Sequence, residues 1–339
     1  MRPPPPAVLA VDGGNSKADV ALVARDGRLL AAVRGPTVSH QQVGMREGVT
    51  RLRALVAEAA RRAGLPTPGD GAVAELGMYC VAGADFRREV SLLTAAYVDS
   101  GLTRRTEVLN DTLAPLRAGT ERGWGVVLIC GAGVNAAGVG PTGRTARLAA
   151  LGPISGDEGG GRDLGMGALG AAVRARDGRG PRTTLERLVP AHFHVARPAA
   201  VTRAMYDGRI EEERVRELSP VVFAAAQAGD AVARGLVDRL ADELAIMAIA
   251  MIRRVGIARR EFDLVLAGGV FLNRDPAFLA RLTAAIQRVA PGARPVPLRA
   301  PPLLGAALLG LDRLMPPAGR GAERTLRAAF AATATPARV

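Results

Sequence analysis

One arrangement of residues occurs twice and constrains the fold more than any other feature. Residues 7–23, AVLAVDGGNSKADVALV, and residues 125–140, GVVLICGAGVNAAGVG, each contain an apolar run, a glycine-rich turn and a second apolar run. Short apolar runs bounded by turn residues predict strands, and glycine allows the chain to reverse sharply between them. In a chain of 339 residues, this repetition predicts an internal duplication with two domains.

The residues around the first copy predict an α/β unit with a mixed sheet. Three antiparallel strands come first, and Asp26–Gly27 gives the hairpin signal between the second and the third. Strands and helices then alternate, as in α/β proteins. We expect a helix over 41–64, a strand over 75–82, a helix over 86–100, a strand over 106–110 and a helix over 112–118.

The second copy begins just after a glycine-rich segment, which places the domain boundary near residues 119–123. Helical segments are expected to about residue 256, followed by a strand over 262–267 and a helix over 275–289. We expect domains over 1–119 and 120–302, with a helix near 303–315 packing back on the first domain and a loosely ordered tail over 316–339.

The charge of the chain raises the hypothesis of nucleic-acid binding. The 45 Lys and Arg residues outnumber the 32 Asp and Glu residues, which gives a formal net charge of +13. The arginines are interleaved with acids on expected helix surfaces, and aromatic residues, on which bases stack, make up only 3%. We therefore expect a solvated, arginine-rich surface and no nucleic-acid partner.

The cysteines and the apolar runs indicate the cellular compartment in which the protein is expected. Cys80 and Cys130 each lie within an apolar run, which predicts two buried thiols and a reducing compartment. The N-terminal residues lack the apolar core of a signal peptide, and the run over 244–252 is too short to span a bilayer. We expect a cytoplasmic protein with no membrane partner.

The first two glycine turns are candidate phosphate sites. Glycines let an anion approach backbone N–H groups closely, and the compact ammonium of Lys17, the only lysine, fits a cramped turn better than a guanidinium does. The first turn, DGGNSK, is also compatible with an ordinary hairpin. The second turn, CGAGVNAAG, matches a dinucleotide-binding pattern, but strand-like rather than helical residues follow it, so a dinucleotide site is disfavoured.

Two further glycine clusters follow. In GPISGDEGGGRDLG, Ser155 and Glu158 have the spacing of a capping box ahead of a helix, and Asp157 is compatible either with a site or with a favourable first-turn acid. In LVLAGGVFLN, a strand runs into Gly268–Gly269, where backbone can lie flat against a planar base. Four such turns exceed what folding alone requires.

Taken in order, these segments resemble the N-acetylglucosamine kinase group of the sugar kinase, heat-shock-70 and actin superfamily, within the BadF/BadG/BcrA/BcrD ATPase family. The resemblance covers residues 8–315. It implies two ribonuclease H-like (actin-like ATPase) domains, each a mixed five-stranded sheet flanked by helices, with an interdomain cleft. It is carried by DGGNSKADV, GPTVSHQQVG, VLNDTLAPLRAG, GAGVNAAGV, LGPISGDEGGGRDLG and LAGGVFLN.

The resemblance implies an ATP-dependent sugar kinase with Mg²⁺, a small-molecule amino-sugar substrate and a homodimer. Phosphoryl transfer needs positioning and charge stabilisation more than covalent chemistry, which suits these residues. Asp111 resembles the general base and Asp12 the acid that holds Mg²⁺ through water. The implied phosphate-binding residues are Gly13, Gly14, Asn15, Ser16, Lys17, Gly131, Ala132 and Gly133; Gly268 and Gly269 lie on the adenine side; Ser39, His40, Asn110, Asn135, Asp157 and Glu158 bind the sugar.

Departures from the family pattern leave alternatives open. Ala132 stands where related kinases often carry Thr, and no aromatic residue follows His40, so N-acetylglucosamine and glucosamine are both candidate substrates. From the residues alone, Asp111 is also compatible with capping the helix that begins at Thr112. The alternative functions are a BadF/BcrA-type ATPase activator of a dehydratase, which needs exposed thiolates for its iron–sulfur cluster, and a non-catalytic sugar or nucleotide sensor.

Overall fold

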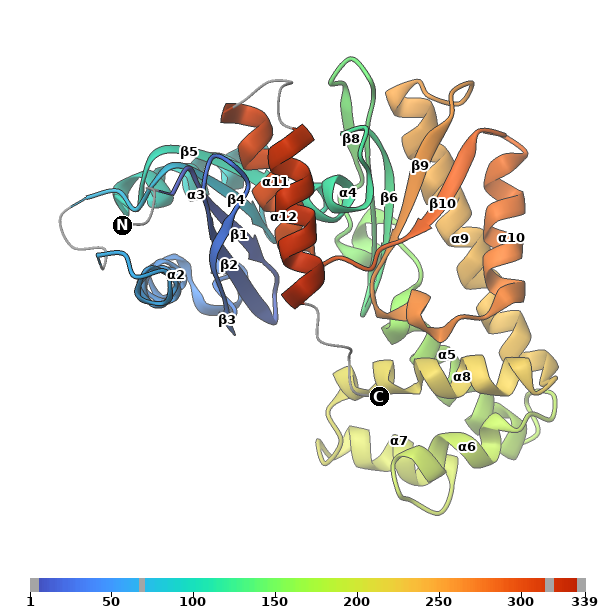
Figure 1. Ribbon diagram of the computed structural model, residues 1–339. Coiled ribbons are helices and arrows are strands. Elements are labelled where there is room, and N and C mark those ends of the chain that lie inside the picture. Colours follow the sequence, from blue (N-terminus) through green and yellow to red (C-terminus); the bar gives the residue numbers. More distant parts are fainter. Residues whose placement is uncertain (1–5, 67–70, 315–319, 334–339) are drawn as a thin grey trace. The chain divides into compact units, whose positions relative to one another are not determined.

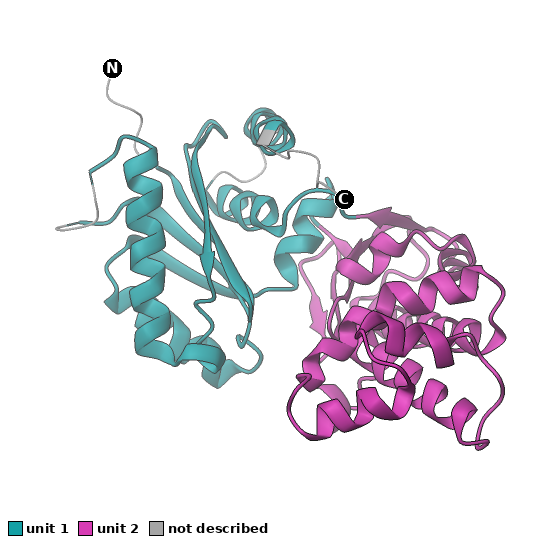
Figure 2. Cartoon of the chain, turned by 90° about the horizontal axis from the view of Figure 1, so that it is seen from below, with its two compact units in different colours: residues 1–123, 298–339 teal, residues 124–297 magenta. Residues whose placement is uncertain are grey.

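The computed structural model describes residues 6–66, 71–314 and 320–333 (Figure 1). The chain forms two compact units, unit 1 with residues 1–123 and 298–339 and unit 2 with residues 124–297 (Figure 2). Each unit is built on one mixed five-stranded sheet flanked by helices. The prediction of two α/β sheets of this kind is confirmed.

The sheet of unit 1 has the strand order β3-β2-β1-β4-β5. The first three strands pair antiparallel, as expected, whereas β4 is parallel to β1 and β5 is parallel to β4. The carboxyl ends of the three parallel strands therefore meet at one edge. The strands are β1 (Val8–Gly13), β2 (Lys17–Val23), β3 (Leu29–Pro36), β4 (Ala74–Val81) and β5 (Thr103–Asn110).

Helices cover both faces of this sheet (Figure 1). Side chains alternate along β1, so Leu9 packs with α2 and α3 on one face while Val8 packs with α4, α11 and α12 on the other. The helix expected over 41–64 is two helices, because Gly44, with φ of 78°, ends the first. The helices are α1 (His40–Val43), α2 (Met45–Arg62), α3 (Arg87–Asp99), α4 (Leu113–Gly119), α11 (Pro302–Leu314) and α12 (Arg320–Thr333).

Helix α12 replaces most of the loosely ordered tail that we expected over 316–339, of which 316–319 and 334–339 lie outside the described residues. Ala322, Leu326 and Phe330 are buried and spaced four residues apart, so they form one apolar face. Buried Arg117 on α4 pairs with Asp312 of α11 at 2.8 Å and with Glu323 of α12 at 2.9 Å. These ion pairs tie both C-terminal helices to α4.

The sheet of unit 2 has the order β10-β9-β6-β7-β8, which is the arrangement of unit 1 with β6 in the place of β1. Strands β6, β7 and β8 pair antiparallel, and β9 and β10 extend the sheet in parallel from β6. The shared strand order supports the duplication inferred from the two glycine turns. The strands are β6 (Gly125–Cys130), β7 (Val134–Val139), β8 (Thr145–Arg147), β9 (Phe262–Ala267) and β10 (Ala293–Pro297).

Unit 2 carries most of the helices. The longest, α9, begins where the Asp230 carboxylate accepts a hydrogen bond from the Ala233 N–H, and it ends at Gly256 in a left-handed conformation. Among the described residues, every helix is too short or too polar to be a candidate membrane span. The helical segments are η1 (Gly152–Ser155), α5 (Gly160–Arg176), α6 (Leu185–His192), α7 (Pro198–Tyr206), η2 (Glu212–Leu218), α8 (Ser219–Gln227), α9 (Ala231–Val255), η3 (Gly269–Asn273) and α10 (Pro276–Gln287).

Candidate active site

The first glycine turn connects β1 to β2 and is held by side chains of the β3–α1 loop. The Gly14 N–H donates to the Lys17 carbonyl at 2.9 Å and closes the turn. The Thr37 hydroxyl donates to the Gly14 carbonyl at 2.8 Å, and the buried Ser39 hydroxyl donates to Asn15 Oδ1 at 2.7 Å. The resemblance implies a sugar contact for Ser39, and the structure brings its hydroxyl to the first glycine turn.

A row of charged side chains lies beside this turn. Asp12 on β1 is directly opposite Asp19 on β2, and Asp19 is opposite Arg34 on β3. Arg34 donates to both carboxylate oxygens of Asp19, at 2.7 and 3.1 Å, while the half-exposed Lys17 Nζ lies 3.9 Å from Asp19. Burial, together with the nearby Asp19 and Asp111 carboxylates, raises the pKa of Asp12 to about 7. This environment favours a cation next to Asp12.

Asp111 follows the end of β5, at the same edge of the sheet as Asp12. Helix α4 begins at Leu113 with Thr112 in the N-cap position, so Asp111 is not the N-cap residue. The preceding Asn110 is buried, and its Nδ2 donates to Asp85 Oδ1 at 2.9 Å. Its Oδ1 accepts hydrogen bonds from the Thr112 N–H at 3.1 Å and hydroxyl at 2.6 Å. We predicted a sugar contact for Asn110, but its amide is bonded within the chain.

Sequence reasoning missed Asp85, which lies in the loop between β4 and α3. The available signal was its position just after a buried strand, at the edge where the other candidates also lie. The same loop contacts His40, because a Cβ on Gly83 would collide with the His40 ring. His40 Nδ1 is buried and has no hydrogen-bond partner among the described residues. Asp12, Ser39, His40 and Asp111 therefore share one edge of unit 1.

The second glycine turn connects β6 to β7 and is held by the backbone of α5. The Gly131 N–H donates to the Gly133 carbonyl at 2.9 Å. The first turn of α5 donates back, from the Gly161 N–H to the Gly131 carbonyl at 2.7 Å and from the Arg162 N–H to the Ala132 carbonyl at 2.9 Å. The turn is exposed at its tip, and its position is fixed by main-chain hydrogen bonds.

Glycine is required at two positions next to this turn. Gly160 has φ of 87°, and a Cβ there would lie 2.6 Å from the Ala132 carbonyl oxygen. Gly268, at the end of β9, has φ of 104°, and its backbone lies directly against Cys130 at the end of β6. These close approaches bring α5, the turn and the Gly268–Gly269 segment to one end of β6.

The remaining sugar candidates of unit 2 lie in different settings. Asn135 is the second residue of β7, and its Oδ1 accepts a hydrogen bond from the Ala136 N–H at 2.8 Å. The Asp157 carboxylate accepts a hydrogen bond from the Ser155 hydroxyl. Glu158 is exposed and lies next to the pocket described below.

The capping box expected from Ser155 and Glu158 was wrong. Ser155 belongs to η1, and its hydroxyl oxygen accepts a hydrogen bond from the Leu151 N–H at 2.8 Å. Helix α5 begins later, with Gly159 as N-cap, and the Gly159 N–H donates to Asp163 Oδ2 at 2.8 Å. Asp163, rather than Glu158, therefore satisfies a backbone donor at the start of α5.

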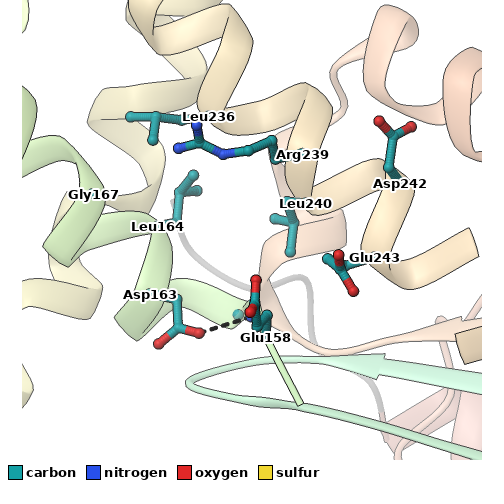
Figure 3. Close-up of a pocket in the computed structure, with 11 residues that line it drawn as sticks. Glu158, Asp163, Leu164, Gly167, Leu236, Arg239, Leu240, Asp242 and Glu243 are labelled. Atoms are coloured by element: carbon teal, nitrogen blue, oxygen red, sulfur yellow. Dashed lines mark hydrogen bonds between the residues drawn. The ribbon is translucent and has the colours of Figure 1, made fainter. Parts of the chain in front are cut away.

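A pocket of about 360 Å³ lies between the start of α5 and the middle of α9 (Figure 3). Acidic side chains surround it: Asp242 and Glu243 come from α9, and Glu158 and Asp163 from the α5 side (Figure 3). Burial, with the nearby Glu158 and Asp242, raises the pKa of Glu243. The other lining residues are Gly159, Gly160, Leu164, Gly167, Leu236, Arg239 and Leu240.

The comparison with protein families assigns the chain. The model of the BadF/BadG/BcrA/BcrD ATPase family matches residues 9–310. The chain belongs to this family. It is 27% identical over 318 residues to the N-acetyl-D-glucosamine kinase of Dictyostelium discoideum, covering 90% of this chain and 97% of that protein. It is 30% identical over 270 residues to the N-acetylmuramic acid/N-acetylglucosamine kinase of Clostridium acetobutylicum, covering 78% and 86%.

Solved structures agree with the fold of this ATPase-family member. A protein from Chromobacterium violaceum, described provisionally as an N-acetylglucosamine kinase, superposes with a TM-score of 0.70 at 24% identity, over 91% of this chain and all of that one. The ROK hexokinase of Thermus thermophilus superposes with a TM-score of 0.57 at 22% identity, over 91% and 98%. At these identities the structures establish the fold.

Both cysteines of this BadF/BadG/BcrA/BcrD family member are buried and free. Burial raises the pKa of the Cys130 thiol to about 12. Burial and the nearby Asp12, Asp111 and Glu107 raise the pKa of the Cys80 thiol well above its ordinary value. Neither thiol is available as a thiolate at neutral pH, because the charged form is disfavoured in both places.

Proposed function

We propose that the protein is an ATP-dependent kinase that transfers the γ-phosphoryl group of ATP to a hydroxyl of an amino sugar. One observation carries this proposal: Asp111, a half-buried carboxylate, lies at the same sheet edge as the first glycine turn and is close enough to raise the pKa of Asp12. A phosphoryl-transfer site needs a carboxylate for the acceptor hydroxyl beside a cradle for the phosphates. The names of the two kinase relatives support the substrate class.

Asp111 acts as the general base in this proposal. It accepts the proton of the sugar hydroxyl as that oxygen attacks the γ-phosphorus, while the bond to the β,γ-bridging oxygen breaks and ADP leaves. The turn around Asp111 is fixed by hydrogen bonds to Asn110 Oδ1, which hold the backbone from which the carboxylate projects. Fixed geometry of this kind lowers the entropy cost of reaching the transition state.

The glycine turns bind the nucleotide in this proposal. Backbone N–H groups of Gly13–Lys17 and Gly131–Gly133 donate to phosphate oxygens, and the Lys17 ammonium adds a point charge. Gly268 and Gly269 lie on the adenine side, where the lack of side chains leaves the backbone open to a planar ring. These roles follow from the family resemblance and from the exposed tips of the turns.

Mg²⁺ fits the residues around Asp12. Magnesium is usually held by one or two carboxylates together with substrate phosphates and water. No group of three or more His, Cys, Asp or Glu side chains within the described ranges is arranged to hold a metal. Asp12 lies among acids that raise its pKa, so a cation there relieves repulsion. We propose that Asp12 holds Mg²⁺ through water, and the ion would neutralise phosphate charge.

The sugar contacts are proposed for Ser39, His40, Asn135, Asp157 and Glu158. Their hydroxyl, imidazole, amide and carboxylate groups are the types that bind sugar hydroxyls. Asn110 is better explained as a positioning residue, because its amide is already bonded to Asp85 and Thr112. N-acetylglucosamine and glucosamine are the proposed substrates. That the protein is a homodimer and that it is cytoplasmic stay predictions.

The alternative of an ATPase activator for a dehydratase has less support. Its iron–sulfur cluster needs accessible thiolates, whereas burial raises the pKa of both Cys80 and Cys130. A sugar or nucleotide sensor would not need Asp111 at the end of β5. These alternatives differ from a kinase in whether ADP release depends on sugar.

The first experiment measures ADP release from Mg-ATP with N-acetylglucosamine, glucosamine, N-acetylmannosamine, N-acetylmuramic acid and glucose. We expect sugar-dependent ADP, and we expect Asp111→Asn to lower kcat by about 10²- to 10⁴-fold because the base is lost. Asp99→Asn, at the exposed end of α3, is the control and should retain wild-type turnover. ADP release that is equal with and without sugar would refute the kinase proposal.

A further inference from the structure

Asp85 is a carboxylate at the candidate site to which none of the roles above is assigned. It lies in the β4–α3 loop, and its Oδ1 accepts a hydrogen bond from Asn110 Nδ2 at 2.9 Å across 25 residues of sequence. Asn110 also donates weakly to the Ala84 carbonyl, at 3.5 Å. Both amide donors of Asn110 thus face the β4–α3 loop.

The other end of the Asn110 amide closes a tight turn around Asp111. Asn110 Oδ1 accepts from the N–H of Thr112, two residues ahead, at 3.1 Å, which is the hydrogen bond of an Asx turn. The Thr112 hydroxyl donates to the same oxygen at 2.6 Å. Asp111 is the central residue of this turn, so its backbone is held on both sides.

The turn depends on which way the Asn110 amide points. The oxygen and the nitrogen of an amide are nearly equal in size, so hydrogen-bond partners decide its orientation. An ionised carboxylate only accepts hydrogen bonds, so Asp85 requires the NH₂ group to face it and the oxygen to face Thr112. Asn110 and Thr112 are buried, so a polar group that loses its partner there is not readily hydrogen-bonded by water, and the loss costs free energy.

We propose that Asp85 is a positioning residue that orients the Asp111 carboxylate by holding the Asn110 amide in the orientation that closes the turn. The consequence for turnover rests on the proposed kinase function, whereas the hydrogen-bond arrangement does not. Asp85 acts through Asn110, and it is the kcat of the reaction rather than the affinity for ATP that depends on it.

The kinetic test compares Asp85→Ala with Asp85→Asn. The alanine removes the acceptor, and we expect kcat to fall about ten- to hundredfold with the KM for ATP within about twofold, because a small misplacement of the base is enough for such a loss. The asparagine retains one acceptor oxygen and should recover most of kcat. Asp99→Ala, at the exposed end of α3, is the matched control and should match the wild type.

A double variant separates positioning from general stability. If Asp85 acts through Asp111, adding Asp85→Ala to Asp111→Asn should cause no further fall in the residual rate. An equal fall in both backgrounds would overturn the proposal, since it would show a structural effect independent of the base. If Asp111→Asn kept full activity, Asp111 would not be the general base, and Asp85 would have no base to position.

Hydrogen exchange tests the arrangement without relying on kinase activity. The buried Thr112 amide is protected by Asn110 Oδ1, so its exchange should become at least about tenfold faster in Asp85→Ala. Unchanged exchange would overturn the proposal even if kcat falls. If the wild type shows no sugar-dependent ADP release, the proposed function fails, and the Thr112 exchange rate still decides whether Asp85 holds the turn.

Discussion

The two glycine turns occupy equivalent positions in sheets of the same strand order, yet they are held in different ways. The β1–β2 turn is held by the side chains of Thr37 and Ser39. The β6–β7 turn is held by main-chain hydrogen bonds from the start of α5, which packs so closely that residue 160 needs to be glycine. Equivalent turns of a duplicated fold are therefore held in different ways: replaceable hydroxyl groups hold the turn in one unit, and close packing against a residue without a side chain holds it in the other.

The turns also differ in charge. Asp12, Lys17, Asp19 and Arg34 form the row beside the first turn, whereas Gly131–Gly133 carry no charge. Variants of the two turns should consequently fail in different ways. In unit 2, close packing predicts that one added methyl group strongly lowers the free energy of unfolding. In unit 1, the charged row predicts an effect on stability that depends on pH.

The largest effect is expected for Gly160→Ala. The added Cβ would lie 2.6 Å from the Ala132 carbonyl, and alanine is strained at φ of 87°. We expect the free energy of unfolding to fall by about 3 kcal/mol and the KM for ATP to rise at least about tenfold, because the turn must move away from α5. Thermal unfolding and initial-rate kinetics measure both.

Gly170→Ala is the matched control for this variant. Gly170 lies in the interior of the same helix, and a Cβ there meets nothing within 4 Å. Alanine should raise the free energy of unfolding by about 0.5–1 kcal/mol and leave the KM unchanged. Equal behaviour of the two variants would show that the contact between α5 and the turn is unimportant.

Asp12→Asn tests the charge of the first turn. The pKa of Asp12 is about 7 in the folded chain, above the ordinary aspartate value of 3.8 expected after unfolding, so between these values the folded state binds more protons. Stability therefore falls as the pH rises through this range, and an asparagine, which cannot ionise, removes the loss. Without nucleotide or Mg²⁺, we expect the variant to be more stable than the wild type by about 1–3 kcal/mol at pH 8.

Thermal unfolding at pH 5 and pH 8 measures this difference. The gain should be smaller at pH 5, because the carboxyl is then protonated in most folded molecules. A gain of the same size at both pH values would show that ionisation of Asp12 is not the cause. Activity should be lost at both pH values if Asp12 holds Mg²⁺ as proposed.

The smallest effect is expected for Ser39→Ala. The variant loses the hydrogen bond to Asn15, which is exposed and can bond to water instead, so we expect a cost of about 1 kcal/mol. The KM for ATP should rise a few fold. Ser91→Ala, which loses only a hydroxyl contact to a carbonyl one turn back in α3, is the control and should leave the KM unchanged. If Ser39→Ala lowered the free energy of unfolding as much as Gly160→Ala, the proposed difference between the two turns would be wrong.

Local patterns were enough to predict most of the fold, and the errors have physical causes. The strands expected over 75–82 and 262–267 correspond to β4 and β9, because short, mostly apolar runs that end at a glycine are strong signals. Strand β10 was missed because Pro295 and Pro297 disrupt the strand pattern, and they are tolerated because β10 is an edge strand. The apolar face of α12 was hidden by its high content of Arg and Ala.

The positions of the candidate residues could be predicted where these residues belong to a local motif, whereas their roles stay predictions. The glycine turns and Asp111 stand out because each follows a strand directly. The role inferred for Asp85 is not local, since it depends on a hydrogen bond to Asn110 that forms only after β4 and β5 pair. The same contact bonds the Asn110 amide, for which the resemblance implies a sugar contact, within the chain.

The way unit 1 is divided along the chain has a consequence during translation. Its sheet strands are made first, but α11 and α12, which cover Val8 and Ala10, come after all of unit 2. At about 5–20 residues per second, the ribosome takes about 10–35 seconds to synthesise residues 124–297. Of the helices that pack on this face, only α4 is made before unit 2, and a nascent chain stalled before residue 298 should bind chaperones through the part of the face that α11 and α12 later cover.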